Sequence, residues 1–111
     1  MDLEEFELVL LLRPAEPTSY DDETLDRIQQ EHLDYLAGLR ESGAVVVNGP
    51  VVDQPNPALR GLTFFRTGSL DEARRLAETD PAVRAGRLEV EVMRWWCPPG
   101  LMVQPGREIR T

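Results

Sequence analysis

Residues 21–42 have the sequence DDETLDRIQQEHLDYLAGLRES, whose pattern predicts an amphipathic helix. The acidic residues in its first turn suit the positive end of a helix, Thr18 or Ser19 is expected to cap it, and Ser42-Gly43 is expected to end it. At about 100° per residue, one stripe holds Leu25, Ile28, His32, Tyr35, Leu36 and Leu39. His32 is therefore expected near the centre of the face that packs on the rest of the molecule.

The segments on either side of this helix predict four strands and a second helix. Alternating or β-branched apolar residues predict strands at 5–13, 44–48, 62–67 and 87–96. Ser69-Leu70-Asp71-Glu72 is typical of a capping box, in which Ser69 accepts from the amide near Glu72 and Glu72 reaches back. A helix is expected from there to about Glu78, and Asp80-Pro81 favours a further short turn.

The resulting order, β-α-β-β-α-β, predicts an α+β fold of the ferredoxin-like type, a four-stranded antiparallel sheet with both helices on one face. The 111 residues are expected to form one domain, residues 1–111, in which residues 98–111 are a tail without clear periodicity. Several strands offer apolar residues to both sides of the sheet. Since the helices cover one face only, a homodimer that buries the other face is expected.

Composition excludes several classes of function. Twenty acidic residues against twelve basic ones, all of them Arg, give a net charge of −8. Binding to nucleic acid or to anionic membranes needs clustered positive charge, so neither is expected. Cys97 is the only cysteine and His32 the only histidine, which argues against a disulfide and against metal sites with two histidines. We therefore expect no metal and no cofactor, and the acidic N-terminus favours a cytoplasmic location.

His32 and Asp80 are the candidate catalytic residues. Histidine ordinarily changes protonation near neutral pH, but a buried histidine bonded to a neighbour is an equally good interpretation of His32. Asp80 precedes a proline at a helix start, which is typical of an N-cap, although a capping carboxylate can leave one oxygen for a histidine. A His–Asp pair would fix the imidazole tautomer and suit a general base or acid.

The candidate substrate-binding residues are Arg13, Asn48, Gly49, Pro50 and Trp96. Gly49-Pro50 either exposes backbone amides at a pocket rim or forms a plain turn. Arg13 either meets an anionic ligand or pairs with an acid at the surface. Trp95 and Trp96 place one ring on each side of the last strand. Either one of these rings lines a pocket, or both rings pack in the core or in a dimer interface.

Several short motifs, in order and spacing, resemble the YCII-related proteins over roughly residues 6–96. They are Glu31-His32-Leu33-Asp34-Tyr35-Leu36, Gly43, Asn48-Gly49-Pro50, Ser69-Leu70-Asp71-Glu72-Ala73, Thr79-Asp80-Pro81-Ala82-Val83, Gly86 and a closing strand that ends in Trp. The resemblance implies a ferredoxin-like fold that dimerises as an α/β barrel. It also implies a pocket whose suspected active site is a His–Asp pair, by motif His32 and Asp80. The loop 14–22 and the tail 98–111 depart from the family pattern.

Three functions are compatible with these residues. The first is a cofactor-independent enzyme without metal, of the lyase or isomerase type, whose His–Asp pair moves a proton on a small cyclic or aromatic substrate. Isomerisation, elimination and dehydration are the reactions of this class. The second is a dimeric module that binds a small molecule without turnover, and the third is a structural or regulatory partner whose acidic surface faces a basic one.

Overall fold

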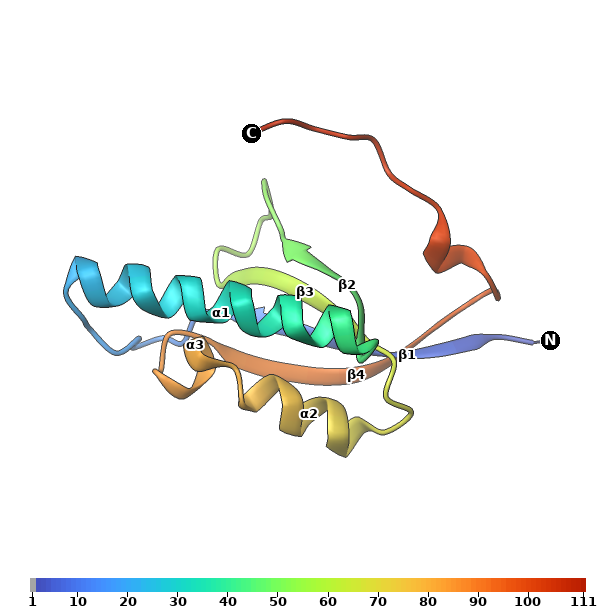
Figure 1. The fold of residues 1–111 in the computed structure, drawn as a ribbon, viewed down its shortest axis with the longest axis horizontal. Coiled ribbons are helices and arrows are strands. Elements are labelled where there is room, and N and C mark those ends of the chain that lie inside the picture. Colours follow the sequence, from blue (N-terminus) through green and yellow to red (C-terminus); the bar gives the residue numbers. More distant parts are fainter. Residues whose placement is uncertain (1) are drawn as a thin grey trace.

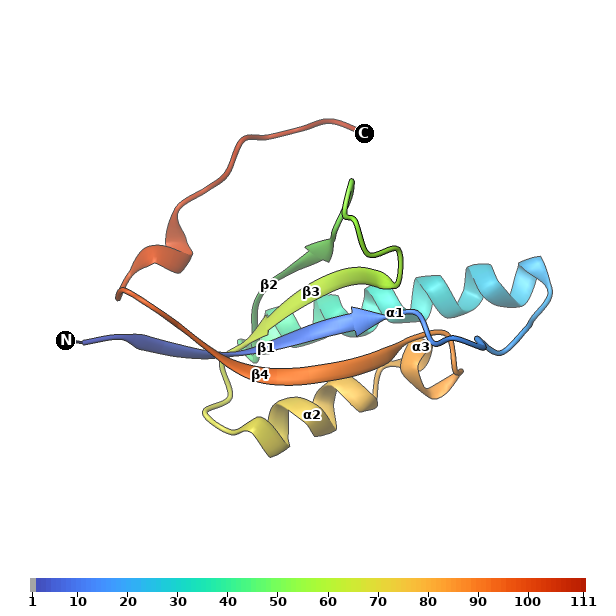
Figure 2. The same ribbon diagram turned by 180° about the vertical axis from the view of Figure 1, so that it is seen from behind.

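The computed structural model describes residues 2–111, in which four strands form one antiparallel sheet (Figure 1). The strands are β1 (Glu4–Leu12), β2 (Val45–Pro50), β3 (Leu59–Phe65) and β4 (Glu89–Cys97), and their order across the sheet is β2-β3-β1-β4. The helices α1 (Asp22–Ser42), α2 (Leu70–Glu78) and α3 (Pro81–Arg84) all lie on one face, as Figure 2 shows from behind. The predicted ferredoxin-like α+β fold is confirmed.

The strand boundaries differ from the prediction by one to three residues, and the largest difference is at the start of β3. β3 begins at Leu59 rather than Leu62, and β2 continues through Gly49 to Pro50. The expectation of a turn at Gly49-Pro50 is therefore wrong. β2 is an edge strand of the sheet, and a proline at the last position of an edge strand removes no essential hydrogen bond from the ladder.

The core lies between the sheet and α2. Alternate residues of β1, Val9 and Leu11, point towards the helices and pack against Ala73 and Ala77 of α2. The alanines carry no bulk beyond a methyl group, so the helix lies close to the sheet. Val45, Phe65, Val90 and Val92 extend this core across the other three strands.

The N-cap of α1 is Asp21, so the expected cap at Thr18 or Ser19 is wrong. The Asp21 carboxylate accepts a hydrogen bond from the Thr24 amide at 2.9 Å, and this bond holds the pKa of Asp21 below its usual value. Thr18 is engaged elsewhere, because its backbone N–H donates to Gly86 O at 3.1 Å. At the other end, Gly43 caps the helix as expected, in the left-handed region with φ 85°.

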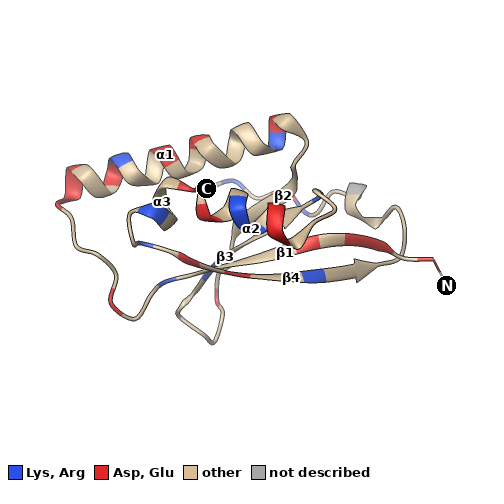
Figure 3. Cartoon of the chain, turned by 90° about the horizontal axis from the view of Figure 1, so that it is seen from below, with Lys and Arg blue, Asp and Glu red and all other residues tan. Residues whose placement is uncertain are grey.

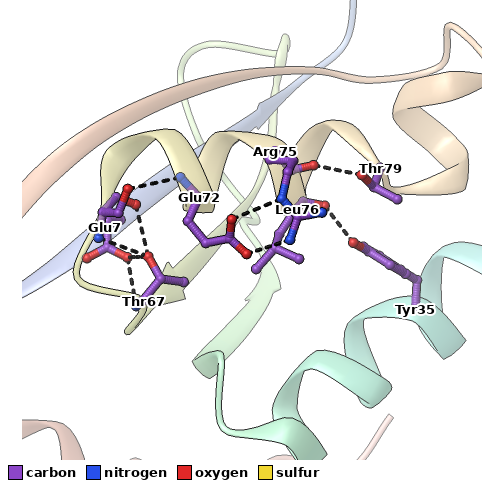
Figure 4. Close-up of polar contacts among 8 residues, drawn as sticks. Glu7, Tyr35, Thr67, Glu72, Arg75, Leu76 and Thr79 are labelled. Atoms are coloured by element: carbon purple, nitrogen blue, oxygen red, sulfur yellow. Dashed lines mark hydrogen bonds and ion pairs between the residues drawn. The ribbon is translucent and has the colours of Figure 1, made fainter.

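The capping box of α2 is only half formed. Ser69 Oγ accepts from the Glu72 amide at 3.2 Å, as expected. The Glu72 carboxylate does not reach back to Ser69 but pairs with Arg75, which lowers the pKa of Glu72 (Figure 4). The Ser69 amide instead donates to Thr67 Oγ1 at 3.1 Å, and the buried carboxylate of Glu7 accepts from the backbone and hydroxyl of Thr67.

The sheet face opposite the helices is apolar along β1 and β3, whereas on β4 Glu91 and Glu89 share this face opposite Leu10 and Leu12. Leu8 pairs with Phe64 and Leu10 with Leu62, and all four point away from the helices because they alternate with core residues. Trp95 extends this surface at β4, where its ring lies 5.1 Å from that of Phe64, centre to centre. No helix in residues 2–111 is both long and apolar enough to cross a membrane.

Beyond β4 the chain leaves the sheet. A short 3-10 turn, η1 (Leu101–Val103), follows Gly100, whose amide donates to Glu4 Oε1 at 2.7 Å. Residues 104–111 are exposed and extend away from the strands (Figure 1).

Candidate active site

His32 and Asp80, 48 positions apart in the sequence, meet beneath α1. The His32 ring lies in the middle of α1, and Asp80 occupies the link between α2 and α3. His32 Nδ1 lies 2.6 Å from Asp80 Oδ2, and the two residues are only 9% and 2% exposed. The other oxygen, Asp80 Oδ1, accepts from the Ala82 amide at 2.9 Å. Asp80 therefore serves both as the N-cap of α3 and as the partner of His32.

This contact favours one tautomer of the imidazole. An ionised carboxylate accepts hydrogen bonds and donates none, so the proton between the two groups belongs to His32 Nδ1. In the neutral ring the second nitrogen, Nε2, then carries a free lone pair. A histidine oriented in this way can accept a proton at Nε2 while its carboxylate partner stabilises the resulting imidazolium.

A contact between α1 and α2 helps to fix the position of His32 relative to Asp80. Tyr35 lies one turn after His32, and its hydroxyl donates to Leu76 O at 2.8 Å, four residues before Asp80 (Figure 4). Thr79 Oγ1 donates to Arg75 O at 2.7 Å and tightens the last turn of α2. Burial raises the pKa of Tyr35, so its hydroxyl stays protonated and able to donate.

A pocket of about 250 Å³ opens beside His32, between α1 and the neighbouring ends of β2 and β3. Its lining is mostly apolar, with polar atoms contributed by a few side chains: Gln29, His32, Asn48 and Arg60. The apolar part of the lining comprises Leu11, Leu33, Leu36, Gly49, Pro50, Gly61, Leu62 and Leu88. Pockets for drug-sized ligands measure roughly 300–1,000 Å³, so this smaller pocket suits a compact molecule such as a single ring.

Three of the candidate substrate-binding residues lie at this pocket. Asn48, Gly49 and Pro50 line it together with His32, because β2 runs beside the middle of α1. Arg40 of α1 donates to the Asn48 side-chain oxygen. This contact occupies the oxygen and leaves the Asn48 amide NH2 as a free donor.

The floor of the pocket depends on Gly61. A Cβ at this position would lie 3.1 Å from the backbone oxygen of Gly49 and 3.6 Å from Leu11 Cδ1. Both of these neighbours line the pocket. The absence of a side chain at Gly61 therefore keeps β2 close to β3 and leaves the space in front of them open.

The other two candidates lie elsewhere. Arg13 lines an adjoining hollow of about 290 Å³ together with Asp26 and Arg87, and this hollow shares Gln29 and Leu88 with the pocket beside His32. Trp96 is 61% exposed and donates from Nε1 to Glu5 Oε1 at 2.8 Å. It pairs with the beginning of β1, whereas the pocket lies at the other end, about six residues or ~20 Å along the strand.

Sequence reasoning overlooked Gln29, Arg60 and Gly61. Gln29 is three residues before His32, so helical periodicity places it on a neighbouring part of the same face. Arg60 and Gly61 precede the predicted start of the third strand and carried no such signal. Within residues 2–111, no three His, Cys, Asp or Glu side chains converge as metal ligands would.

A ferredoxin-like sheet with a buried His–Asp pair beside a small pocket defines the class of this protein. The sequence profile of the YCII-related domain matches residues 8–96, and the chain belongs to the YCII-related family. No curated protein matches the chain.

Among solved structures, the chain is similar to 5-chloro-2-hydroxyhydroquinone dehydrochlorinase from Burkholderia phenoliruptrix AC1100, determined in complex with 2,5-dihydroxybenzoquinone. The two share 26% sequence identity with a TM-score of 0.55, over 79% of this chain and 92% of that one. This structural neighbour is an enzyme that acts on a small aromatic compound.

Proposed function

We propose that this protein is a small-molecule enzyme in which His32 transfers a proton to and from a substrate held in the pocket. The observation that carries the proposal is the 2.6 Å contact between His32 Nδ1 and Asp80 Oδ2, formed by a histidine that also lines the pocket. A histidine that served packing alone would need no open cavity beside it.

In the proposed reaction, His32 Nε2 takes a proton from an acidic C–H or O–H of the substrate. Asp80 stabilises the imidazolium that forms and keeps the ring in position. The proton returns to a different substrate atom in an isomerisation, or assists a leaving group in an elimination or dehydration. Transfer by one positioned group contributes about 10²–10⁴-fold to the rate, so positioning by the pocket supplies the remainder.

The proposed substrate is a small cyclic or aromatic compound. The pocket volume of about 250 Å³ supports this class, as does the apolar lining with a few polar side chains. Asn48, with its free amide donor, is the proposed hydrogen-bond partner of a substrate oxygen, and Gly49 and Pro50 form the wall beside it. The dehydrochlorinase with its bound ring compound supports the same class.

We further propose that the working form is a homodimer whose two sheets pack face to face. The apolar face formed by Leu8, Leu10, Leu62 and Phe64 supports this assembly, because contiguous apolar surface of this kind is rarely left in water. A second copy would cover it with an identical surface.

The test compares turnover in two variants, His32→Asn and Asp80→Asn, against the unmodified protein. Substrates are a panel of hydroxylated and halogenated ring compounds, with product followed by absorbance and halide release. Both variants are expected to lose at least about 10²-fold in kcat while circular dichroism shows an unchanged fold. The matched control is Asp34→Asn, which changes an exposed carboxylate on the same helix and is expected to keep full activity.

The alternative is a module that binds a small molecule without turnover. In that case 2,5-dihydroxybenzoquinone would bind to the unmodified protein, but no compound of the panel would be converted. The two variants would then weaken binding and have no rate to change. That result would overturn the catalytic proposal.

A further inference from the structure

The lining of the pocket lacks the acidic side chains that are numerous in the rest of the protein. The chain carries −8 overall, and its acidic residues are spread over α1, the first part of β1, α2 and several loops (Figure 3). None of its twenty acidic residues lines the pocket beside His32. Apart from His32, the ionisable side chain in the lining is Arg60. Arg60 therefore places a positive charge at the lining, while the carboxylate of Asp80 lies behind His32 and is bonded to it, so the open side of the pocket favours a ligand that carries negative charge.

The fold gives Arg60 an irregular position in β3. In the pairing of β1 with β3, Leu11 is opposite Gly61 and Leu12 is opposite Leu59, so Arg60 is the extra residue of a β-bulge. A bulge breaks the regular alternation of a strand and re-aims a side chain. The backbone remains fixed, because Arg60 O accepts a hydrogen bond from the Val51 amide at 3.1 Å.

Among residues 2–111, no side chain or backbone group pairs with the Arg60 guanidinium. It forms no ion pair and no side-chain hydrogen bond with any residue from 2 to 111, although several other arginines pair with carboxylates. A guanidinium presents donors in a planar fork that matches a carboxylate or two ring oxygens. At the pocket this fork is available to a ligand.

We propose that Arg60 is the specificity-determining residue of the pocket and recognises a substrate with an anionic oxygen on its ring. The proposal rests on the proposed function and names its substrate class: enolates, hydroxyquinone anions and ring carboxylates. His32 comes from α1 and Arg60 from β3, so a ring between them has its charged oxygen anchored on the sheet side. The atom that exchanges a proton then faces the helix.

The test measures binding of two probes at pH 7 by titration calorimetry. The probes are 2,5-dihydroxybenzoquinone, which is anionic at this pH, and hydroquinone, a neutral ring of similar size. Arg60→Gln is expected to weaken binding of the anion about tenfold, the typical contribution of a charge-assisted hydrogen bond, and to change hydroquinone binding less than about twofold. Arg60→Lys is expected to keep part of the affinity, because it retains the charge and loses the fork.

The matched control is Arg66→Gln, one residue beyond the end of β3. Arg66 is also exposed and makes no ion pair within residues 2–111, but it lies outside the pocket lining. This variant is expected to bind both probes as the unmodified protein does. A similar loss in both variants would mean a general effect of net charge and would overturn the proposal.

Two further results would overturn it: undiminished binding of the anion by Arg60→Gln, and no measurable binding of the anion by the unmodified protein. The proposed catalysis is judged separately through His32→Asn, which retains Arg60. If the anion binds in an Arg60-dependent manner but no turnover depends on His32, the catalytic proposal falls and the anion site stands. If turnover depends on His32 but not on Arg60, the catalytic proposal stands and the anion site falls.

Discussion

At the scale of single residues, Asp80 carries two roles on two oxygens. Oδ1 caps α3 through the Ala82 amide, and Oδ2 accepts from His32. Asparagine is as good an N-cap as aspartate but cannot supply the negative charge that stabilises an imidazolium. The two roles are therefore separable by the choice of substitution.

We expect Asp80→Asn to lower the free energy of unfolding by about 1 kcal/mol and Asp80→Ala by about 2–4 kcal/mol, since alanine also leaves buried polar groups unsatisfied. Urea denaturation of both variants measures the difference. Both variants should lose activity to a similar extent, because both lack the carboxylate. Equal stability of the two variants would show that the cap contributes little.

At the scale of elements, α1 and its C-terminal cap each hold a glycine, and the two glycines have opposite requirements. Gly38 is exposed within the helix, and a Cβ built there meets nothing within 4 Å. Gly43 ends the helix with φ 85°, a conformation that side chains with a Cβ disfavour. The same change to alanine should thus have opposite signs at the two positions.

Gly38→Ala is expected to raise the free energy of unfolding by about 0.5–1 kcal/mol, because alanine is the better helix former. Gly43→Ala is expected to lower it by about 1 kcal/mol, through strain in the left-handed region. Chemical denaturation, with the slope of the transition checked for constancy, measures both. Stabilisation at Gly43 would contradict the assigned cap.

Tyr35 links α1 to α2 and should make stability depend on pH in the alkaline range. Burial, with a further contribution from the negative charge of Asp80, raises the pKa of Tyr35 above its usual 10.0. The unfolded chain then loses the hydroxyl proton first as pH rises. This contribution to stability is complete below pH 10 and is lost as the pH rises through the folded-state pKa.

Tyr35→Phe removes the hydroxyl, and with it both its contribution to the alkaline pH dependence of stability and the hydrogen bond to Leu76 O. Its free energy of unfolding at pH 7 is expected to fall by about 1 kcal/mol, and its stability should decline less steeply above pH 10 than that of the unmodified protein. Denaturant titrations between pH 8 and 11 measure this slope. An identical alkaline slope in both proteins would exclude Tyr35 as its source.

The elements themselves could be predicted from the sequence because their signals are local. The stripe around His32, the alternation in β1 and the Asp80-Pro81 helix start each depend on neighbours a few residues apart. Within the site, the His–Asp contact required a resemblance to a family, since the two residues are 48 positions apart. Periodicity predicts faces but gives no distance between them.

The missed features are those that depend on tertiary contacts. The cap of α1 is Asp21, the residue directly before the helix start, whereas Thr18 lies three residues further away, where its backbone is bonded to Gly86. The bulge at Arg60 arises from the register of β3 against β1, which a single strand does not encode. The distance of Trp96 from the pocket likewise follows from the direction in which β4 pairs.

At the scale of the whole molecule, the apolar residues on the sheet face opposite the helices are covered by no helix among residues 2–111. Phe64 and Trp95 pack edge to face on it, with Leu8 and Leu10 beside them. A stable interface buries about 800 Å² on each partner, which a four-stranded sheet face can supply. Since this face lies opposite the helices, a second copy packed on it would leave the helices of each chain exposed to solvent.

We expect light scattering at about 10 μM to give twice the mass of one chain, and Phe64→Arg to give the mass of one. Charge introduced at the centre of the face would have to be buried against its own copy in the dimer, a cost of several kcal/mol per ion.

Because Phe64 also packs on Trp95, Met93→Arg at the rim provides a second variant that disturbs the chain less. Val52→Arg, which alters an exposed apolar residue outside the strands, is the control and should remain dimeric. A single-chain mass for the unmodified protein would contradict the packing of sheet on sheet, and a dimer that persists in both face variants would mean that the copies associate through another surface.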